Sequence, residues 1–267
     1  MIGDFRDKAV LVTGGTMGIG LATALAFGKR GAHCTLTYAW GSADEDAVRR
    51  TFAEAKAPEP LLIQADASRG EDTTRLLTEL RARHRHVEAF ISNVSQAVLV
   101  ESVDDYSPRA LFQSIQYSAW PLVDYTFQIR ERFGRYPRYV VGLSSTGVDQ
   151  FSWGYDLMAA SKAVMETLCR YLNYRLYDED LRINVLRTRS VRTESFRTAF
   201  GSDFEAFARR FTREEHFVDP GEVADAAVAL CSGLMDGVRG QVITVDRGTS
   251  FFDNLMRLYN ERESLQL

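Results

Sequence analysis

The sequence predicts an α/β fold, built as one domain around a doubly wound parallel sheet flanked by helices. Short apolar runs rich in β-branched residues alternate with longer helical patterns along the chain. This alternation is typical of right-handed βαβ units, and therefore of a parallel sheet. The 267 residues suffice for one large core, and no repeat, low-complexity tract or linker divides them. We therefore expect a single domain over residues 1–267.

The individual elements follow from these patterns in order. Strands are expected at the apolar runs 9–13, 34–38, 61–64, 89–92, 138–143, 183–186 and 242–245. Helices are expected near 18–30, 43–56, 71–84, 106–133, 155–177 and 220–232. The last helix has a clear start, because Asp219 can cap it, Pro220 suits its first turn and Glu222 completes a capping box. Pro121 lies inside the pattern at 106–133 and predicts a kink there.

Composition argues against several classes of protein. The formal net charge of -4 argues against nucleic-acid binding, which needs a basic surface. No apolar run reaches the roughly 18 residues of a membrane helix, and the charged N-terminal segment is unlike a signal peptide. The 3 cysteines and 4 histidines show no metal-ligand spacing, so we expect no metal site. These features favour a cytoplasmic protein with reduced cysteines.

A glycine-rich turn follows the first expected strand and opens a helix. It reads TGGTMGIG over residues 13–20. Gly14 permits a tight turn, Gly18 lets the backbone approach a phosphate, and Gly20 lets helix and strand pack closely. The helix N-terminus then offers N–H groups and the positive end of its dipole to a pyrophosphate. A glycine cluster alone could be a structural turn, but its place between strand and helix favours a dinucleotide site.

The chain resembles the short-chain dehydrogenase/reductase family over nearly its whole length. The motifs that carry the resemblance are the glycine pattern at 13–20, Asp66-Ala67, Asn93, Ser144-Ser145, Lys162, Thr193 and the segment 245–248. The resemblance implies a Rossmann-type fold and a nicotinamide cofactor. The cofactor-binding residues that it implies are Gly14, Thr16, Met17, Gly18, Ile19, Gly20, Asp66, Ala67, Asn93, Lys162, Val191 and Thr193.

The choice between NADPH and NADH depends on the end of the second strand. A carboxylate there would bind the ribose hydroxyls of NAD, and the segment 37–42 contains none, which favours NADPH. Met17 and Trp40 stand where members of the family often have the arginines that hold the 2′-phosphate. Ser42 and backbone amides could bind this phosphate instead. We therefore expect NADPH, with NADH as the alternative.

The expected catalytic residues include a displaced tyrosine. Met158 stands where the family's Tyr-x-x-x-Lys helix has its tyrosine, and Tyr155 lies three residues earlier. Positions seven apart share one face of a helix, so Tyr155 and Lys162 can serve one site. Ser145 lies 13 residues before Met158, which is the family's interval between catalytic serine and tyrosine. The resulting Tyr-x6-Lys spacing resembles type III enoyl-acyl-carrier-protein reductases, while Met158 itself could be a flexible apolar filler.

The displacement suits reduction of a carbon–carbon double bond. When hydride adds to the β-carbon of an enoyl thioester, negative charge develops on the thioester oxygen, two bonds further away than in a ketone. Tyr155 could protonate this oxygen, Lys162 would hold the nicotinamide ribose and lower the phenol pKa, and Ser145 would orient the acyl group. We expect an NAD(P)H-dependent enoyl thioester reductase of fatty-acid or secondary-metabolite biosynthesis. The alternatives are a ketoreductase acting on a β-keto or polyketide substrate, and a cofactor-binding pseudoenzyme in which Tyr155 only packs.

The segment at about 190–218 corresponds to the family's substrate lid. It contains six phenylalanines: Phe196, Phe200, Phe204, Phe207, Phe211 and Phe217. Their helical spacing could pack them on the core or on an acyl chain. Two groups of arginines lie nearby: Arg187, Arg189 and Arg192 before the lid, and Arg209, Arg210 and Arg213 within it. The first group could bind an anionic group and the second an acyl carrier protein, or both could be solvated.

The expected partners are few. They are an acyl thioester, on coenzyme A or an acyl carrier protein, and further copies of this chain. The resemblance implies a homotetramer or homodimer that packs through the helices near 106–133 and 155–177. We expect neither nucleic acid nor a membrane as a partner.

Overall fold

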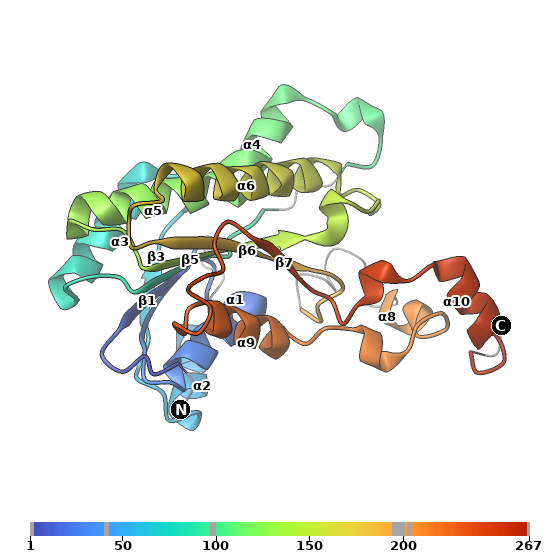
Figure 1. Cartoon of the computed structure of the whole chain (residues 1–267), viewed down its shortest axis with the longest axis horizontal. Helices are drawn as coiled ribbons and strands as arrows, with labels where there is room; N and C mark the ends of the chain where they lie inside the picture. Colours follow the sequence, from blue (N-terminus) through green and yellow to red (C-terminus); the bar gives the residue numbers. More distant parts are fainter. Residues whose placement is uncertain (1–2, 40–42, 97–99, 194–200, 202–203, 266–267) are drawn as a thin grey trace.

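A computed structural model describes residues 3–39, 43–96, 100–193, 201 and 204–265. It confirms the predicted α/β fold (Figure 1). The strands are β1 (Ala9–Val12), β2 (His33–Tyr38), β3 (Leu61–Gln64), β4 (Ala89–Ser92), β5 (Tyr139–Ser145), β6 (Arg182–Thr188) and β7 (Val242–Val245). They form one sheet in the order β3-β2-β1-β4-β5-β6-β7, and every neighbouring pair is parallel.

The strand order reverses at β1, which pairs with β2 on one side and β4 on the other. Connections therefore leave β1 and β4 in opposite directions. In doubly wound sheets this switch point is where ligands bind. The glycine turn after β1 and Asn93 after β4 both lie at this point.

Helices cover both faces of the sheet. They are α1 (Gly18–Gly28), α2 (Glu45–Glu54), α3 (Gly70–Arg83), α4 (Pro108–Ser118), α5 (Trp120–Phe133), α6 (Asp156–Arg175), α8 (Phe204–Ala208), α9 (Pro220–Leu230) and α10 (Asn254–Glu261). Figure 1 shows α1, α2 and α9 on one face and α3 to α6 on the other. Because side chains alternate along a buried strand, Val10 and Val12 pack with the first group while Leu11 packs with the second.

The helical pattern expected at 106–133 is two helices rather than one kinked helix. α4 ends at Ser118 and α5 begins at Trp120, with Pro121 in its first turn. Proline lacks the N–H that a helix interior requires, and in a first turn that N–H is not needed. The break therefore falls just before Pro121. α10 and the short 3-10 segments η1 (Val103–Asp105), η2 (Thr146–Val148), η3 (Glu214–His216) and η4 (Thr249–Phe251) were not expected.

Several smaller expectations concern single residues. At the start of α9, the backbone N–H of Asp219 donates to Glu222 Oε2 at 2.9 Å, as expected for a capping box. Cys34, Cys169 and Cys231 are free and buried, as expected for reduced cysteines. Tyr155, which the pattern places inside a helix, instead lies at the N-cap of α6.

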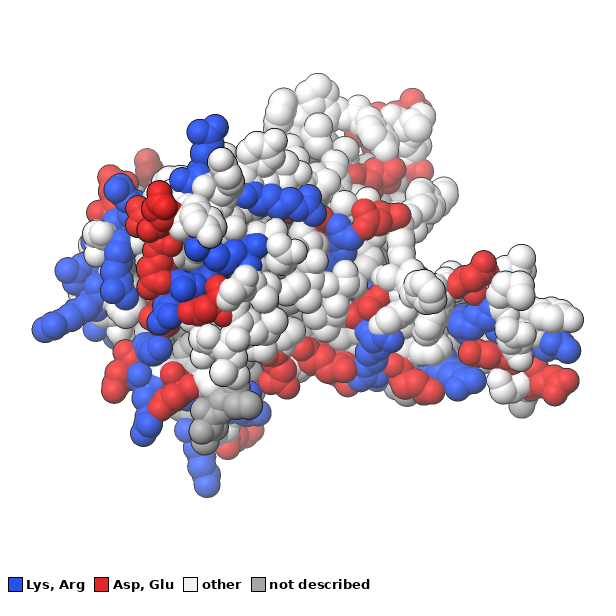
Figure 2. Space-filling view, in the orientation of Figure 1, with Lys and Arg blue, Asp and Glu red and all other residues white. Residues whose placement is uncertain are grey.

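The surface mixes charges of both signs. Figure 2 shows acidic and basic side chains interspersed over the face that it presents, with fewer charges over α4. Within the described part of the chain, every helix is too short or too polar to cross a bilayer.

Candidate active site

In the glycine turn, the backbone of the first turn of α1 lies against the backbone of Gly14. Gly14 and Gly18 have φ of 62° and 54°, in the left-handed region that favours glycine. A side-chain carbon on Gly20 would lie 2.2 Å from the Gly14 carbonyl oxygen, so α1 can pack on the turn only without one. Met17, at the N-cap of α1, supplies no side-chain hydrogen bond. The first N–H groups of α1 are therefore not capped by its side chain, as an anion site requires.

Asn93 supports this turn rather than pointing away from it. Its Nδ2 donates to the carbonyl oxygens of Thr13 and Gly14 at 3.1 and 2.9 Å. Its backbone N–H donates to Thr13 Oγ1 at 3.1 Å. The side-chain amide is thus occupied by the two residues that open the turn. Asn93 fixes the shape of the predicted dinucleotide site from β4, 80 residues away in sequence.

The remaining predicted cofactor residues beside α1 fall into two groups. Thr16 is buried and Ile19 packs against the core, while Met17 is exposed. Thr193 lies against the turn from the other side, because a carbon added to Gly18 would be 3.4 Å from Thr193 Cγ2. Val191 is buried and bridges to Val218 in parallel pairing. The segment leaving β6 therefore crosses to the start of α1.

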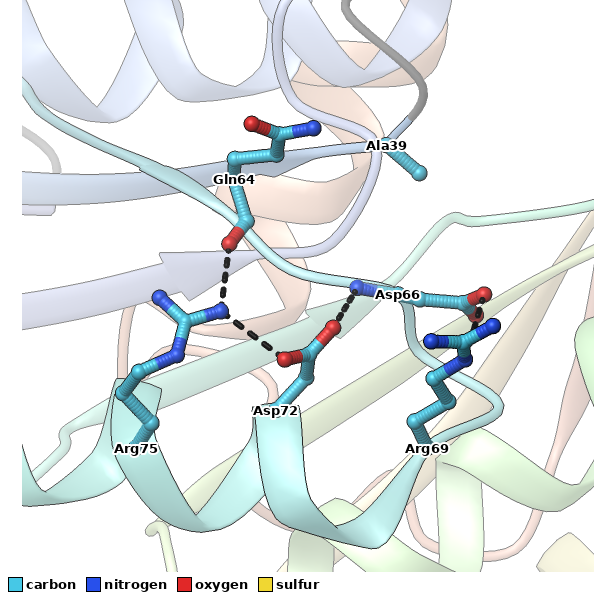
Figure 3. A pocket seen from close by; sticks show the side chains of 6 residues that line it. All are labelled: Ala39, Gln64, Asp66, Arg69, Asp72 and Arg75. Carbon is cyan, nitrogen blue, oxygen red and sulfur yellow. Dashed lines mark hydrogen bonds and ion pairs between the residues drawn. The ribbon is translucent and has the colours of Figure 1, made fainter.

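A cavity of about 310 Å³ lies where β2 and β3 end and α3 begins (Figure 3). Its lining residues are Ala39, Gln64, Asp66, Arg69, Asp72 and Arg75. Asp66 Oδ1 accepts from the N–H and the hydroxyl of Ser68, and Tyr117 donates to Asp66 Oδ2 at 3.2 Å. Asp72 accepts from the Asp66 N–H at 2.9 Å and from Arg75 at 2.8 Å. Both acids are thus already engaged by neighbouring donors.

Arg69 is a cavity residue that the sequence reasoning missed. Its Nε lies 3.7 Å from Asp66 Oδ2, beyond hydrogen-bond distance, and its side chain is 75% exposed. The signal was present in the sequence, as a basic residue three positions after Asp66. Ala39, at the end of β2, brings no carboxylate to the cavity, and Ala67 is buried beside it. Trp40 and Ser42 lie outside the described residues.

Tyr155 and Ser145 meet at Gly147. A side-chain carbon on Gly147 would lie 2.6 Å from Tyr155 Cδ1 and 3.6 Å from Ser145 Oγ. The Gly147 N–H also donates to Ser145 Oγ at 3.2 Å. The Tyr155 ring can therefore lie close to Ser145 only because position 147 has no side chain. Burial raises the pKa of Tyr155, contrary to the expectation that Lys162 lowers it, and the interaction that acts in the opposite direction comes from the Ser145 hydroxyl.

Lys162 lies in α6 with its amine buried beneath the end of β5. The Nζ donates to the Leu143 carbonyl oxygen at 2.7 Å, and only 4% of the residue is exposed. Burial lowers the pKa of Lys162 to about 8, although the negative charge of Glu166 one turn later favours the charged amine.

Glu166 anchors a buried ionic cluster behind Lys162. Its Oε1 accepts from Ser144 Oγ at 2.6 Å and from Arg187 Nε at 3.0 Å, and its Oε2 accepts from Arg187 at 2.5 Å. Arg187 also pairs with Asp149, in the loop that follows Ser145. The sequence left open whether Arg187 binds an anionic ligand or is solvated. In the structure its guanidinium is instead held by carboxylates of the protein. It ties β6 to α6 and to the Ser145 loop.

Met158 fills a different position from Tyr155. It is buried, and its Sδ accepts from the hydroxyls of Ser95 at 3.2 Å, Ser118 at 3.6 Å and Ser161 at 3.8 Å. A thioether carries no ionisable proton and is a weak acceptor. The position that holds the tyrosine in the resembled family is therefore occupied by a side chain that cannot donate a proton.

The described part of the lid lines a second cavity, of about 250 Å³. Phe204, Phe207, Phe211 and Phe217 line it, and Phe252 joins them; Phe196 and Phe200 lie outside the described residues. Of the basic residues expected nearby, Arg189 lines this cavity, whereas Arg192 lies 5.0 Å from the centre of the Phe217 ring. Arg209 is exposed, Arg210 lies over Phe211, and Arg213 is 3.6 Å from Glu261.

No cluster of three or more His, Cys, Asp or Glu residues suited to a metal ion occurs in the described ranges. The structure places the glycine turn at the start of α1, and it places Ser145 and Tyr155 beside Gly147. One cavity lies at the β2–β3 end of the sheet and the other near its β6–β7 end.

Comparisons with known proteins agree with this geometry. A family model described as enoyl-(acyl carrier protein) reductase matches residues 14–250. The chain is 24% identical to the NADH-dependent enoyl-[acyl-carrier-protein] reductase FabI of Aquifex aeolicus (strain VF5), over 99% of this chain and 98% of that protein. It is also 24% identical to 1-cyclohexenylcarbonyl-CoA reductase of Streptomyces collinus, over 92% of this chain and 88% of that protein.

Solved structures share the fold at low sequence identity. A variant of actinorhodin polyketide ketoreductase with NADPH superposes with a TM-score of 0.81 at 21% identity, covering 92% of this chain and 98% of that one. This likeness concerns the fold alone. The family match, the order of the sheet and the glycine turn together show that the chain belongs to the short-chain dehydrogenase/reductase family of oxidoreductases.

Proposed function

We propose that this protein reduces the carbon–carbon double bond of an enoyl thioester with NADPH, and that Tyr155 donates the proton. The observation that carries the proposal is the position of two residues. Met158 stands where the family has its tyrosine, and Tyr155 lies three residues earlier. Tyr155 lies beside Ser145, and Met158, which cannot donate a proton, is buried among serine hydroxyls. The proton donor is thus displaced from its place in carbonyl reductases, while Ser145 and Lys162 remain.

The chemistry assigns a different task to each side chain. A bound reduced nicotinamide would supply the hydride. Tyr155 holds its proton firmly because burial raises its pKa, so it acts as a neutral donor to the thioester oxygen as negative charge develops there. Ser145 Oγ accepts from the Gly147 N–H and its hydroxyl interacts with Tyr155, so Ser145 orients the phenol toward the same oxygen.

Lys162 would hold the ribose hydroxyls and place positive charge near the reacting oxygen. Its amine donates one N–H to the Leu143 carbonyl oxygen. An ammonium has three N–H donors, so two remain for the ribose. The buried cluster of Glu166 and Arg187 fixes α6 against β6 and so fixes the position of Lys162. The amine is charged below a pH of about 8.

We further infer a preference for NADPH over NADH. Ala39 brings no carboxylate to the end of β2, so nothing at that position repels a 2′-phosphate. Arg69 is exposed, lies in the cavity beside Ala39 and can turn toward such a phosphate with little cost, since its contact with Asp66 is long. Arg69 would then serve in place of the arginines that Met17 and Trp40 replace.

Acyl thioesters are the substrates that the relatives' names indicate, one on an acyl carrier protein and one on coenzyme A. We propose the same class for this chain, and association of copies through α4, α5 and α6. Large apolar side chains are exposed on these helices: Phe112, Trp120, Phe127, Tyr171 and Tyr174. Exposed apolar surface of this extent favours a protein interface.

The test compares two substrates with the purified protein. Oxidation of NADPH is followed with a trans-2-enoyl thioester and, separately, with the 3-ketoacyl thioester of the same length. Turnover on the enoyl substrate alone supports the proposal, and turnover on the ketone alone contradicts it. Met158→Tyr provides a second arm, because it returns a phenol to the ordinary position and should raise activity on the ketone.

A further inference from the structure

The lid cavity combines an apolar lining with positive charge. Five phenylalanines line it: Phe204, Phe207, Phe211, Phe217 and Phe252. Arg189 and Arg257 line it as well, and none of its described lining residues is an aspartate or glutamate. A cavity that only packed the lid onto the protein would not need guanidinium groups. Apolar walls with a few charged groups are instead typical of a binding site.

Arg257 is held in place but retains a free donor. Its side chain is only 13% exposed, with one terminal nitrogen donating to the Phe211 carbonyl oxygen at 2.7 Å and the other to Glu261 at 3.1 Å. Its Nε is buried without a hydrogen-bond partner among the described residues. The Nε is shielded from the cavity, but each terminal nitrogen has a second N–H that a ligand in the cavity can accept from.

Arg189 approaches the cavity from the sheet. It follows Thr188, which pairs with Ser145 in the register of β5 and β6, so the cavity begins next to the predicted catalytic serine. One of its terminal nitrogens donates to the Thr249 carbonyl oxygen at 3.0 Å. A guanidinium has five N–H donors, so as far as the described residues go, most of those on Arg189 remain for a ligand.

The other charged groups lie around the cavity rather than in its described lining. Glu261 faces Arg257 from within α10 but also contacts Arg213, and Asp246 at the end of β7 interacts with Arg189. His216 lines the cavity, and burial together with the neighbouring Arg257 lowers its pKa, so the ring is neutral at pH 7. Arg213 is also 4.0 Å from Glu215, so three carboxylates balance three arginines around the cavity, but none of these carboxylates is in the described lining, whereas Arg189 and Arg257 are.

We propose that this cavity binds an apolar acyl group whose far end carries a carboxylate, with the carboxylate held between Arg189 and Arg257. The proposal rests on the proposed function, because it assigns the cavity to the acyl part of the substrate. The phosphopantetheine arm also carries an anion, but its amide groups need polar partners that phenylalanines do not supply. Hydrocarbon matches this lining, and a carboxylate matches the two guanidinium groups.

The first test uses a matched pair of probes, 3-phenylpropionate and 3-phenylpropionamide. Binding to the full-length protein is measured by calorimetry, with and without NADP⁺, at constant ionic strength. The acid should bind at least about tenfold more tightly than the amide, because charge-assisted hydrogen bonds are worth that much or more. Equal binding of the two probes, or binding of neither, would overturn the proposal without the need for any variant.

Variants then test whether Arg189 and Arg257 hold the carboxylate of the acid probe. Arg189→Met and Arg257→Met should each remove most of the preference for the acid, and Arg262→Met, on the same C-terminal segment but outside the cavity lining, should keep it. A preference for the acid that survives in both cavity variants would also overturn the proposal. Arg257 also holds α10 to Phe211, so its replacement can disturb folding. Arg189→Met keeps the proposal testable in that case.

Kinetic measurements distinguish a failure of this proposal from a failure of the proposed reductase function. Enoyl thioesters of equal length that end in a carboxylate or a methyl group are compared, and the carboxylate should lower KM about tenfold. Selective binding of the acid probe without turnover on any enoyl thioester would contradict the proposed function but not the cavity. Turnover with equal KM for the two substrates would support the function and contradict the cavity.

Discussion

Replacing Lys162 with methionine should make the protein more stable while it abolishes activity. The amine is buried in α6, and burial lowers its pKa from 10.5 to about 8. That difference corresponds to about 3 kcal/mol by which the folded state disfavours the charged amine. The substitution also leaves the Leu143 carbonyl oxygen without its partner, at a cost of about 1 kcal/mol. The net expectation is stabilisation by about 2 kcal/mol at pH 7.

The sign of the pH dependence follows from the lowered pKa. Between pH 8 and 10.5 the unfolded chain binds more protons at this lysine than the folded protein does, so the wild type gains stability as the pH rises. Below pH 8 the full cost of the buried charge is present. The advantage of Lys162→Met should therefore be largest at pH 7 and nearly absent at pH 10.

Urea unfolding at pH 7 and pH 10 measures both quantities. Comparing each variant with wild type at the same pH cancels the titration of all other groups. Lys29→Met, at an exposed position that ends α1, is the matched control and should change stability little at either pH. A Lys162→Met protein that is less stable than wild type at pH 7, or equally shifted at both pH values, would refute the reasoning.

Four further substitutions test other parts of the structure. Gly147→Ala places a carbon 2.6 Å from the Tyr155 ring and should lower kcat about 100-fold, whereas Gly221→Ala, with open space around it, should leave kcat unchanged. Gly20→Ala places a carbon 2.2 Å from the Gly14 oxygen and should abolish cofactor binding, measured by fluorescence titration with NADPH. Arg69→Ala should weaken NADPH binding about tenfold in the same titration and leave NADH binding unchanged. Arg187→Met leaves the buried Glu166 carboxylate without its ionic partner and should lower the free energy of unfolding by about 3–5 kcal/mol. Asp149→Asn removes the partly exposed partner of Arg187 and should lower it by less than about 1 kcal/mol.

Much of the fold follows from the sequence because its signals are local. The strands at 89–92 and 242–245 have the expected bounds, since each is a short apolar run between polar residues. The division at Ala119 was expected only as a kink. Whether a proline bends a helix or begins a new one depends on the packing of both segments, which no local pattern contains.

The site was predictable where a motif fixes the backbone. The glycine turn and Asn93, both taken from motifs, come together because each lies at the end of its strand and the strands are neighbours. The roles of Arg187 and Arg257 were not predictable. Arg187 reaches Glu166 across 21 positions and Arg257 reaches Phe211 across 46, and such pairings depend on strand register and on how the lid folds back. Tyr155 was expected within the helix but lies at its cap, because the turn at Gly154, with φ of 70°, precedes it.

The most direct measurement is the activity of Tyr155→Phe on a trans-2-enoyl thioester with NADPH. Tyr174→Phe, in the same helix but exposed, is the matched control. If Tyr155 is the proton donor, kcat/KM should fall by about 10²–10⁴ in Tyr155→Phe and stay unchanged in Tyr174→Phe, with NADPH binding intact in both. Full activity in Tyr155→Phe would contradict the central claim that the displaced tyrosine donates the proton.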